Sequence, residues 1–136
     1  MTTQIIRKLS VALLAAASVC AQASQKITVQ IPFGFHVGNS VLPSGEYTVD
    51  TDAAPGVVRV RSADAKSTVM ILSMATQTSA TPSTGKLVFN KYGDEYFLSQ
   101  IWKAGTNRGS ELRKSRREVE VAASARRGVQ TIMASK

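Results

Sequence analysis

Apolar and polar positions alternate along the chain from Ile27 to Val37. Every odd position in this stretch is apolar, and the even positions hold polar residues, a proline or a glycine. A period of two predicts a strand with one buried face. Pro32 has no backbone donor and Gly34 permits a bend, so we expect the strand to break or bulge near Pro32.

Further short runs predict more strands. Residues 46–49 and 57–61 alternate again, and in the second run Val58 and Val60 should face the core while the arginines that follow them face solvent. Residues 68–74 form a nearly continuous apolar run bounded by polar residues. A run of that length predicts a central strand that is covered on both faces.

Two longer runs predict a β-hairpin. Residues 86–92 and 95–102 are rich in aromatic and β-branched side chains, and only Gly93 and Asp94 separate them. A two-residue connection with glycine first favours a primed turn, because glycine accepts positive φ. The expected cross-strand pairs are Phe89 with Leu98, Asn90 with Phe97, and Lys91 with Tyr96. The Ser/Thr-rich residues 77–85 before this hairpin predict an exposed loop.

Together these runs predict a mainly β protein, a small antiparallel β-barrel or sandwich of about seven strands with a C-terminal helix. Residues 24–104 form the expected β-domain. Residues 105–128 are a basic segment, expected to be helical and to pack on or beside that domain, and 129–136 a flexible tail.

The start of the expected helix is placed at Ser110, whose side chain could cap it, with Glu111 in the first turn. Leu112 and Val119 give it a thin apolar stripe. Residues 118–121 alternate like a strand, so a strand remains the alternative for this segment.

The N-terminal residues 1–23 have the features of an export signal. Arg7 and Lys8 precede an apolar stretch, and Ala21-Gln22-Ala23 carries small residues at both positions that determine cleavage. We expect cleavage after Ala23 and a periplasmic or extracellular protein. A retained membrane anchor is one alternative, but it would need about 20 apolar residues, and the apolar stretch is shorter. A lipoprotein acylated at Cys20 is the other, but a small residue would then precede the cysteine, and here Val19 does.

Cleavage would leave 113 of the 136 residues and remove the single cysteine. Disulfides, thiolate nucleophiles and cysteine zinc sites are then excluded. His36 is the only histidine, so a site with two histidine ligands is impossible and a catalytic triad would have to use this residue. We therefore predict no metal, no cofactor and no enzymatic activity. A hydrolase that uses His36 ranks last.

Charge is concentrated near the C-terminus. Residues 24–102 carry six basic and six acidic side chains, whereas residues 103–136 carry nine basic and three acidic ones. Such a cluster attracts polyanions, so anionic envelope polymers, lipid head groups or an envelope protein are candidate partners. Few aromatics interleave with it, and we expect no specific nucleic-acid recognition. The candidate polyanion-binding residues are Arg108, Arg113, Lys114, Arg116 and Arg117.

An alternative interpretation makes this segment a solvated helix face. In that case Lys114 would pair with Glu118, and Arg116 with Glu120, at the i,i+4 spacing.

A second candidate function is a carrier for a small apolar ligand. A small barrel can hold one ligand among inward-facing side chains, although in a chain of this length such side chains more often form the core. The available wall consists of Phe33, Phe35, Tyr47, Phe89, Tyr96, Phe97 and Trp102.

Three motifs carry a resemblance to known proteins. They are Ile31-Pro32-Phe33-Gly34-Phe35, Leu42-Pro43-Ser44-Gly45-Glu46-Tyr47-Thr48-Val49 and Tyr92-Gly93-Asp94-Glu95-Tyr96-Phe97-Leu98. The chain resembles a group of small exported bacterial proteins that share the layout IPFxF, LPxGEYxV and YGxxYFL. The resemblance implies an exported β-protein and assigns no substrate or catalytic residue. We therefore expect a non-enzymatic interaction or structural protein of the envelope.

Overall fold

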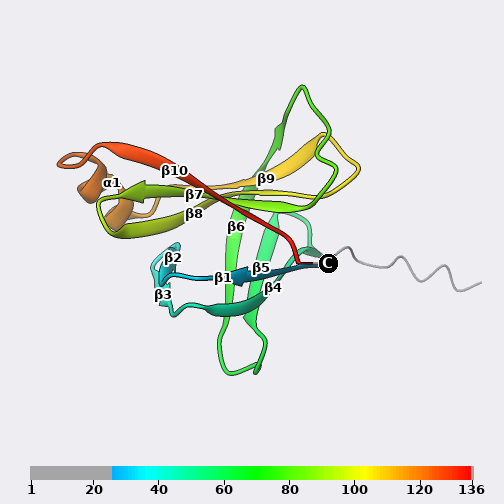
Figure 1. Ribbon diagram of the computed structural model, residues 1–136, viewed down its shortest axis with the longest axis horizontal. Helices are drawn as coiled ribbons and strands as arrows, with labels where there is room; N and C mark the ends of the chain where they lie inside the picture. Colours follow the sequence, from blue (N-terminus) through cyan, green and yellow to red (C-terminus); the bar gives the residue numbers. More distant parts are fainter. Residues whose placement is uncertain (1–25, 136) are drawn as a thin grey trace, which may run out of the picture.

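The computed structural model describes residues 26–135, so the predicted export signal, with Cys20, lies outside the described residues. The described chain is mainly β, as predicted, with ten strands and one short helix (Figure 1). The elements are β1 (Ile27–Ile31), β2 (Phe35–Val37), β3 (Ser40–Leu42), β4 (Gly45–Ala54), β5 (Val57–Ser62), β6 (Thr68–Gln77), β7 (Lys86–Tyr92), β8 (Glu95–Trp102), β9 (Arg108–Leu112), α1 (Arg116–Ala122) and β10 (Arg127–Met133).

The strands form one strongly bent sheet. Its order is β1-β4-β5-β6-β9-β8-β2-β3, and β7 pairs with both β8 and β10. The long strand β6 makes the bend, because its first half pairs with β5 and its second half with β9. Strands β1, β4 and β5 thus lie across the core from β7, β8 and β10 (Figure 1).

The sheet does not close, so the barrel among the two predicted arrangements is wrong. The free edges of β1 and β10 approach each other where the Ser135 backbone N–H donates to the Thr28 carbonyl at 2.7 Å. No ladder joins β1 to β10 within residues 26–135. The described residues form ten strands instead of the expected seven, because the first strand divides into β1 and β2 and the C-terminal quarter adds β9 and β10.

Alternation in the sequence places the core as expected. Ile27, Val29 and Ile31 of β1 are buried, as are Val58 and Val60 of β5. The first strand breaks around Pro32, since β1 ends at Ile31 and β2 begins at Phe35. The prediction of a broken first strand is therefore confirmed.

The predicted hairpin forms in the predicted register. Phe89 lies opposite Leu98, Asn90 opposite Phe97 and Lys91 opposite Tyr96. Gly93 has a φ of 61°, the left-handed conformation that the tight turn requires. Local turn chemistry and alternation are sufficient to fix this unit.

Strand β6 differs from its prediction. It pairs with β5 along its first half and with β9 along its second, yet Met70, Leu72 and Met74 on its outer face are 61%, 72% and 50% exposed. Only the opposite face, which carries Val69 and Ile71, packs against the core. The prediction of cover on both faces is wrong, because no described element lies over the outer side of this strand.

The C-terminal quarter also differs. Ser110 lies in β9, and the cap of α1 is Ser115, whose Oγ accepts the Glu118 backbone N–H at 3.1 Å. Residues 129–133, predicted as part of a flexible tail, belong to β10 and pair with β7. The helical part of 105–128 is thus limited to residues 116–122. Its flanks are strands of the sheet rather than an added arm.

Candidate functional site

Four of the five candidate polyanion-binding residues lie together at α1. Arg113 and Lys114 follow β9, and Arg116 and Arg117 begin the helix. All four are exposed. We call Arg113, Lys114, Arg116 and Arg117 the basic cluster.

Glu118 fixes the orientation of α1. This residue is 3% exposed, and its Oε2 accepts a hydrogen bond from the Asn90 side-chain amide at 2.9 Å and one from the Tyr92 hydroxyl at 3.0 Å. The contacts fasten the helix to β7. Burial and the bond to the Glu118 carboxylate raise the pKa of the Tyr92 hydroxyl above 10.0, while the charge of Arg127 acts in the opposite direction.

This orientation leaves most of the basic cluster without counter-charges. The predicted pair of Lys114 with Glu118 is wrong, because Glu118 points inward to Asn90 and Tyr92. Among the ion pairs of residues 26–135, Arg117 with Glu95 is the only one that involves the cluster. The predicted pair of Arg116 with Glu120 is not among them.

Arg117 has a structural partner. Its guanidinium contacts both oxygens of Glu95, at 3.1 and 3.2 Å from Nη2. The same Oε1 of Glu95 also lies 3.5 Å from His36 Nε2. The His36 ring stacks on Phe97 with centroids 4.3 Å apart. His36 therefore lies between an aromatic ring and a carboxylate that already binds an arginine.

The fifth candidate, Arg108, lies elsewhere. It begins β9, at the opposite end of that strand from the basic cluster. There it lines a shallow hollow of about 230 Å³ together with Lys103, whose Nζ contacts both oxygens of Asp52 at 2.8 Å. Sequence proximity grouped Arg108 with the cluster, but the strand separates them.

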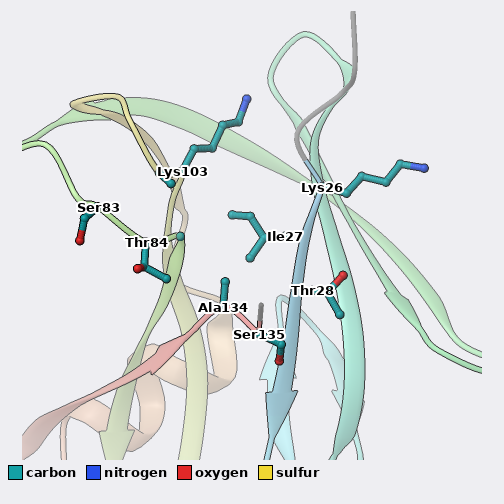
Figure 2. A pocket seen from close by; sticks show the side chains of 10 residues that line it. Lys26, Ile27, Thr28, Ser83, Thr84, Lys103, Ala134 and Ser135 are labelled. Carbon is teal, nitrogen blue, oxygen red and sulfur yellow. The ribbon is translucent and has the colours of Figure 1, made fainter. Parts of the chain in front are cut away.

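A larger open groove, of about 580 Å³, lies where the edges of β1 and β10 approach each other. Figure 2 shows Lys26 and Lys103 extending outward at its rim, with Ile27 in the space between β1 and the segment of Thr84. No local pattern in the sequence indicates this groove, because its wall comes from four separated segments. They are residues 26–28, 83–85, 103–104 and 134–135.

The aromatic candidates for an apolar site fill space between the layers. Phe33 stacks on Tyr96 at 3.8 Å, and Phe35 packs edge-on against both Tyr47 and Phe89. Burial raises the pKa of the Tyr47 hydroxyl, which donates to the Pro43 carbonyl at 2.6 Å. These five rings pack against one another: Phe35, Tyr47 and Phe89 are buried in the core, and Phe33 and Tyr96 are half-buried against it.

The other two aromatic candidates lie outside this cluster. Phe97 lies between the His36 and Tyr92 rings. Trp102 covers Gly109, where an added Cβ would lie 2.5 Å from the indole ring. The structure thus does not bring the seven predicted residues around one interior space.

Metal-ligand clusters and membrane-spanning helices were considered for the part of the chain that the structure describes. No cluster of three or more His, Cys, Asp or Glu side chains in it is arranged to hold a metal ion. None of its helices has the length and apolar character needed to cross a membrane.

Comparisons with protein-family models, with curated proteins and with solved structures found no match. The function of this chain is therefore inferred from its own geometry.

Proposed function

We propose that this chain is an exported, non-enzymatic interaction protein whose basic cluster binds an anionic polymer of the cell envelope. The observation that carries the proposal is the inward orientation of Glu118, which is 3% exposed and bound to Asn90 and Tyr92. Glu118, the acid whose i,i+4 spacing would let it neutralise Lys114, is therefore not available to pair with it. The cations at the start of the anchored helix α1 then face solvent.

The electrostatics favour a multivalent partner. Exposed charges are screened by salt, and a single surface ion pair contributes little. Three or four cations within five residues gain affinity by engaging several negative groups of one polymer. A polymer with repeated phosphate, sulfate or carboxylate groups fits this requirement better than a small anion.

The test is a titration with dextran sulfate, monitored by calorimetry at low and high salt. The variant Arg113→Gln/Lys114→Gln/Arg116→Gln removes three exposed charges and keeps Arg117, which binds Glu95. We expect wild-type binding that weakens with salt, and a loss of about tenfold in the variant, equivalent to about 1.4 kcal/mol.

A matched control removes the same charge outside the basic cluster and outside any other proposed site, in Lys66→Gln/Lys86→Gln/Arg108→Gln. We expect it to keep nearly all of the wild-type affinity. An equal loss in both variants would show that net charge alone attracts the polymer and would overturn the assignment to the cluster. Truncation is unsuitable as a test, because residues 108–133 include β9 and β10.

Export is tested separately, by the intact mass of the protein recovered from its host. Cleavage after Ala23 predicts a chain that starts at Ser24 and carries no cysteine. A full-length mass, or a lipid adduct on Cys20, would contradict it.

A further inference from the structure

The outer face of β6 is an apolar surface without a cover. Met70, Leu72 and Met74 follow one another on this face, and each is at least half exposed. Side chains that alternate along a strand share one face, so the three form a continuous row, which we call the apolar stripe. Large apolar side chains gathered on a surface mark an interaction site more often than isolated ones do.

The stripe itself offers apolar side chains to a partner. The backbone of β6 is paired with β5 along residues 68–72 and with β9 along 73–77, so each half of the strand has one neighbouring strand. Three flexible apolar side chains on this face suit an apolar phase that requires no hydrogen bonds.

Cations lie beside the stripe on the same face. Cross-strand register places Arg59 next to Met70, and Arg61 next to Thr68. Arg59, Arg61 and Lys26 line a hollow of about 340 Å³ with Thr28, Thr48 and Ser62. The hollow and the stripe are therefore adjacent, because Arg59 on β5 lines the hollow and lies opposite Met70 on β6.

Donors dominate the hollow. Its one carboxylate, Asp50, already accepts from Arg59 at 2.9 Å and from the Asp52 backbone N–H at 2.9 Å. Lys26 and Arg61 are exposed and form no ion pair within residues 26–135. The hollow thus offers cationic and hydroxyl donors, and its one carboxylate is already hydrogen-bonded. Phosphate oxygens, which only accept, suit such a site better than a peptide, whose N–H groups would need acceptors.

We propose that this face docks on an anionic phospholipid bilayer. Lipid phosphates contact Lys26 and Arg61 at the hollow, while Met70, Leu72 and Met74 enter the boundary between head groups and acyl chains. Basic side chains near an anionic leaflet each increase the affinity, and apolar burial adds to this. The proposal uses no residue of the basic cluster and is independent of polymer binding there.

Co-sedimentation with vesicles tests the proposal. Wild-type protein should bind vesicles that contain phosphatidylglycerol and should not bind vesicles of phosphatidylcholine alone. The variant Met70→Ser/Leu72→Ser/Met74→Ser should lower binding about tenfold or more, and Lys26→Gln/Arg61→Gln should do the same and remove the salt dependence. The matched controls are Val41→Ser, at an apolar residue 68% exposed on β3, and Lys66→Gln in the β5–β6 turn.

Insertion is read out by fluorescence. Phospholipids brominated in the acyl chain should quench a tryptophan placed at Leu72→Trp and leave one at Val41→Trp unaffected. Both variants keep the buried Trp102 as a constant background.

Several results would overturn the proposal. One is absence of wild-type binding to anionic vesicles, and another is binding that depends on the basic cluster and not on the stripe. Light scattering could also show a dimer that the stripe variant dissociates, while vesicle binding is the same in the variant and the wild type. That result would identify a second copy of the chain as the partner of the stripe. Loss of polymer binding alone would leave this proposal standing.

Discussion

Strands β7 and β6 both lie inside the sheet, each with two neighbouring strands, but their outer faces differ. The outer face of β7 carries Asn90 and Tyr92, and α1 is fastened over them by Glu118. The outer face of β6 carries the apolar stripe and faces solvent. The difference shows that a strand with two neighbouring strands need not be covered on both faces. Whether the outer face of a strand is covered depends on where the C-terminal segment with α1 packs, and it packs on β7.

The largest expected effect compares two leucines on these strands. Leu87 of β7 is fully buried and Leu72 of β6 is 72% exposed. Leu87→Ala should lower the free energy of unfolding by about 2–5 kcal/mol, because it opens a cavity. Leu72→Ala should change it by less than about 0.5 kcal/mol. Urea denaturation of both variants measures the difference, and similar losses would mean that β6 is covered in solution.

The next largest loss of stability is expected when the Glu118 hydrogen bonds that hold α1 on β7 are removed. Glu118→Ala leaves the Asn90 amide and the Tyr92 hydroxyl without their acceptor in a buried site. We expect the free energy of unfolding to fall by about 2–4 kcal/mol. Glu120→Ala, at an exposed position of the same helix, is the matched control and should cost less than about 0.5 kcal/mol. Equal effects at the two positions would contradict the anchoring role of Glu118.

A smaller effect is expected at the contact of β9 with β8. A Cβ on Gly109 would lie 2.5 Å from the Trp102 ring and 2.8 Å from the Ile101 carbonyl oxygen. Gly109→Ala should therefore cost about 1–3 kcal/mol through overpacking. Gly128→Ala has its nearest contact at 3.9 Å and should leave the thermal midpoint nearly unchanged. If Gly109→Ala were equally neutral, Trp102 would not cover this strand.

The smallest effect concerns alkaline pH. Folding raises the pKa of Tyr92, so the native state holds its proton more tightly, and stability falls as the pH rises above 10.0. Tyr92→Phe removes one bond to Glu118 at neutral pH, at a cost of about 1 kcal/mol. It should also reduce the alkaline loss, leaving the part due to Tyr47, whose pKa is raised by burial as well. Denaturation from pH 7 upward checks this, and an unchanged alkaline slope would contradict it.

The elements that could be predicted from sequence are the ones that local chemistry specifies. The β7–β8 hairpin follows from Gly93 and from alternation on both sides, and its register is as predicted. The helix start also has a local signal, because Ser115 and Glu118 have the spacing of a capping box. Ser110 resembles a cap only when the helix is extended upstream from Val119 to include Leu112.

The rest depends on contacts between distant residues. Glu118 finds partners 28 and 26 residues earlier in the chain, so spacing within the helix could not reveal its inward orientation. The continuous apolar run of β6 is typical of a buried strand, and only the position of α1 over β7 shows that nothing covers it. Lys26, Arg59 and Arg61 are likewise joined by sheet register rather than by sequence.

The central claim is that two separate surfaces contact two kinds of anionic partner. Backbone amide shifts of the isotopically labelled protein, recorded with dextran sulfate and then with phosphatidylglycerol bicelles, test it most directly. We predict that the polymer shifts residues 113–117 and leaves 69–74 unchanged, and that the bicelles do the reverse. Shifts at the same residues with both probes, or shifts spread evenly over all exposed cations, would contradict the claim.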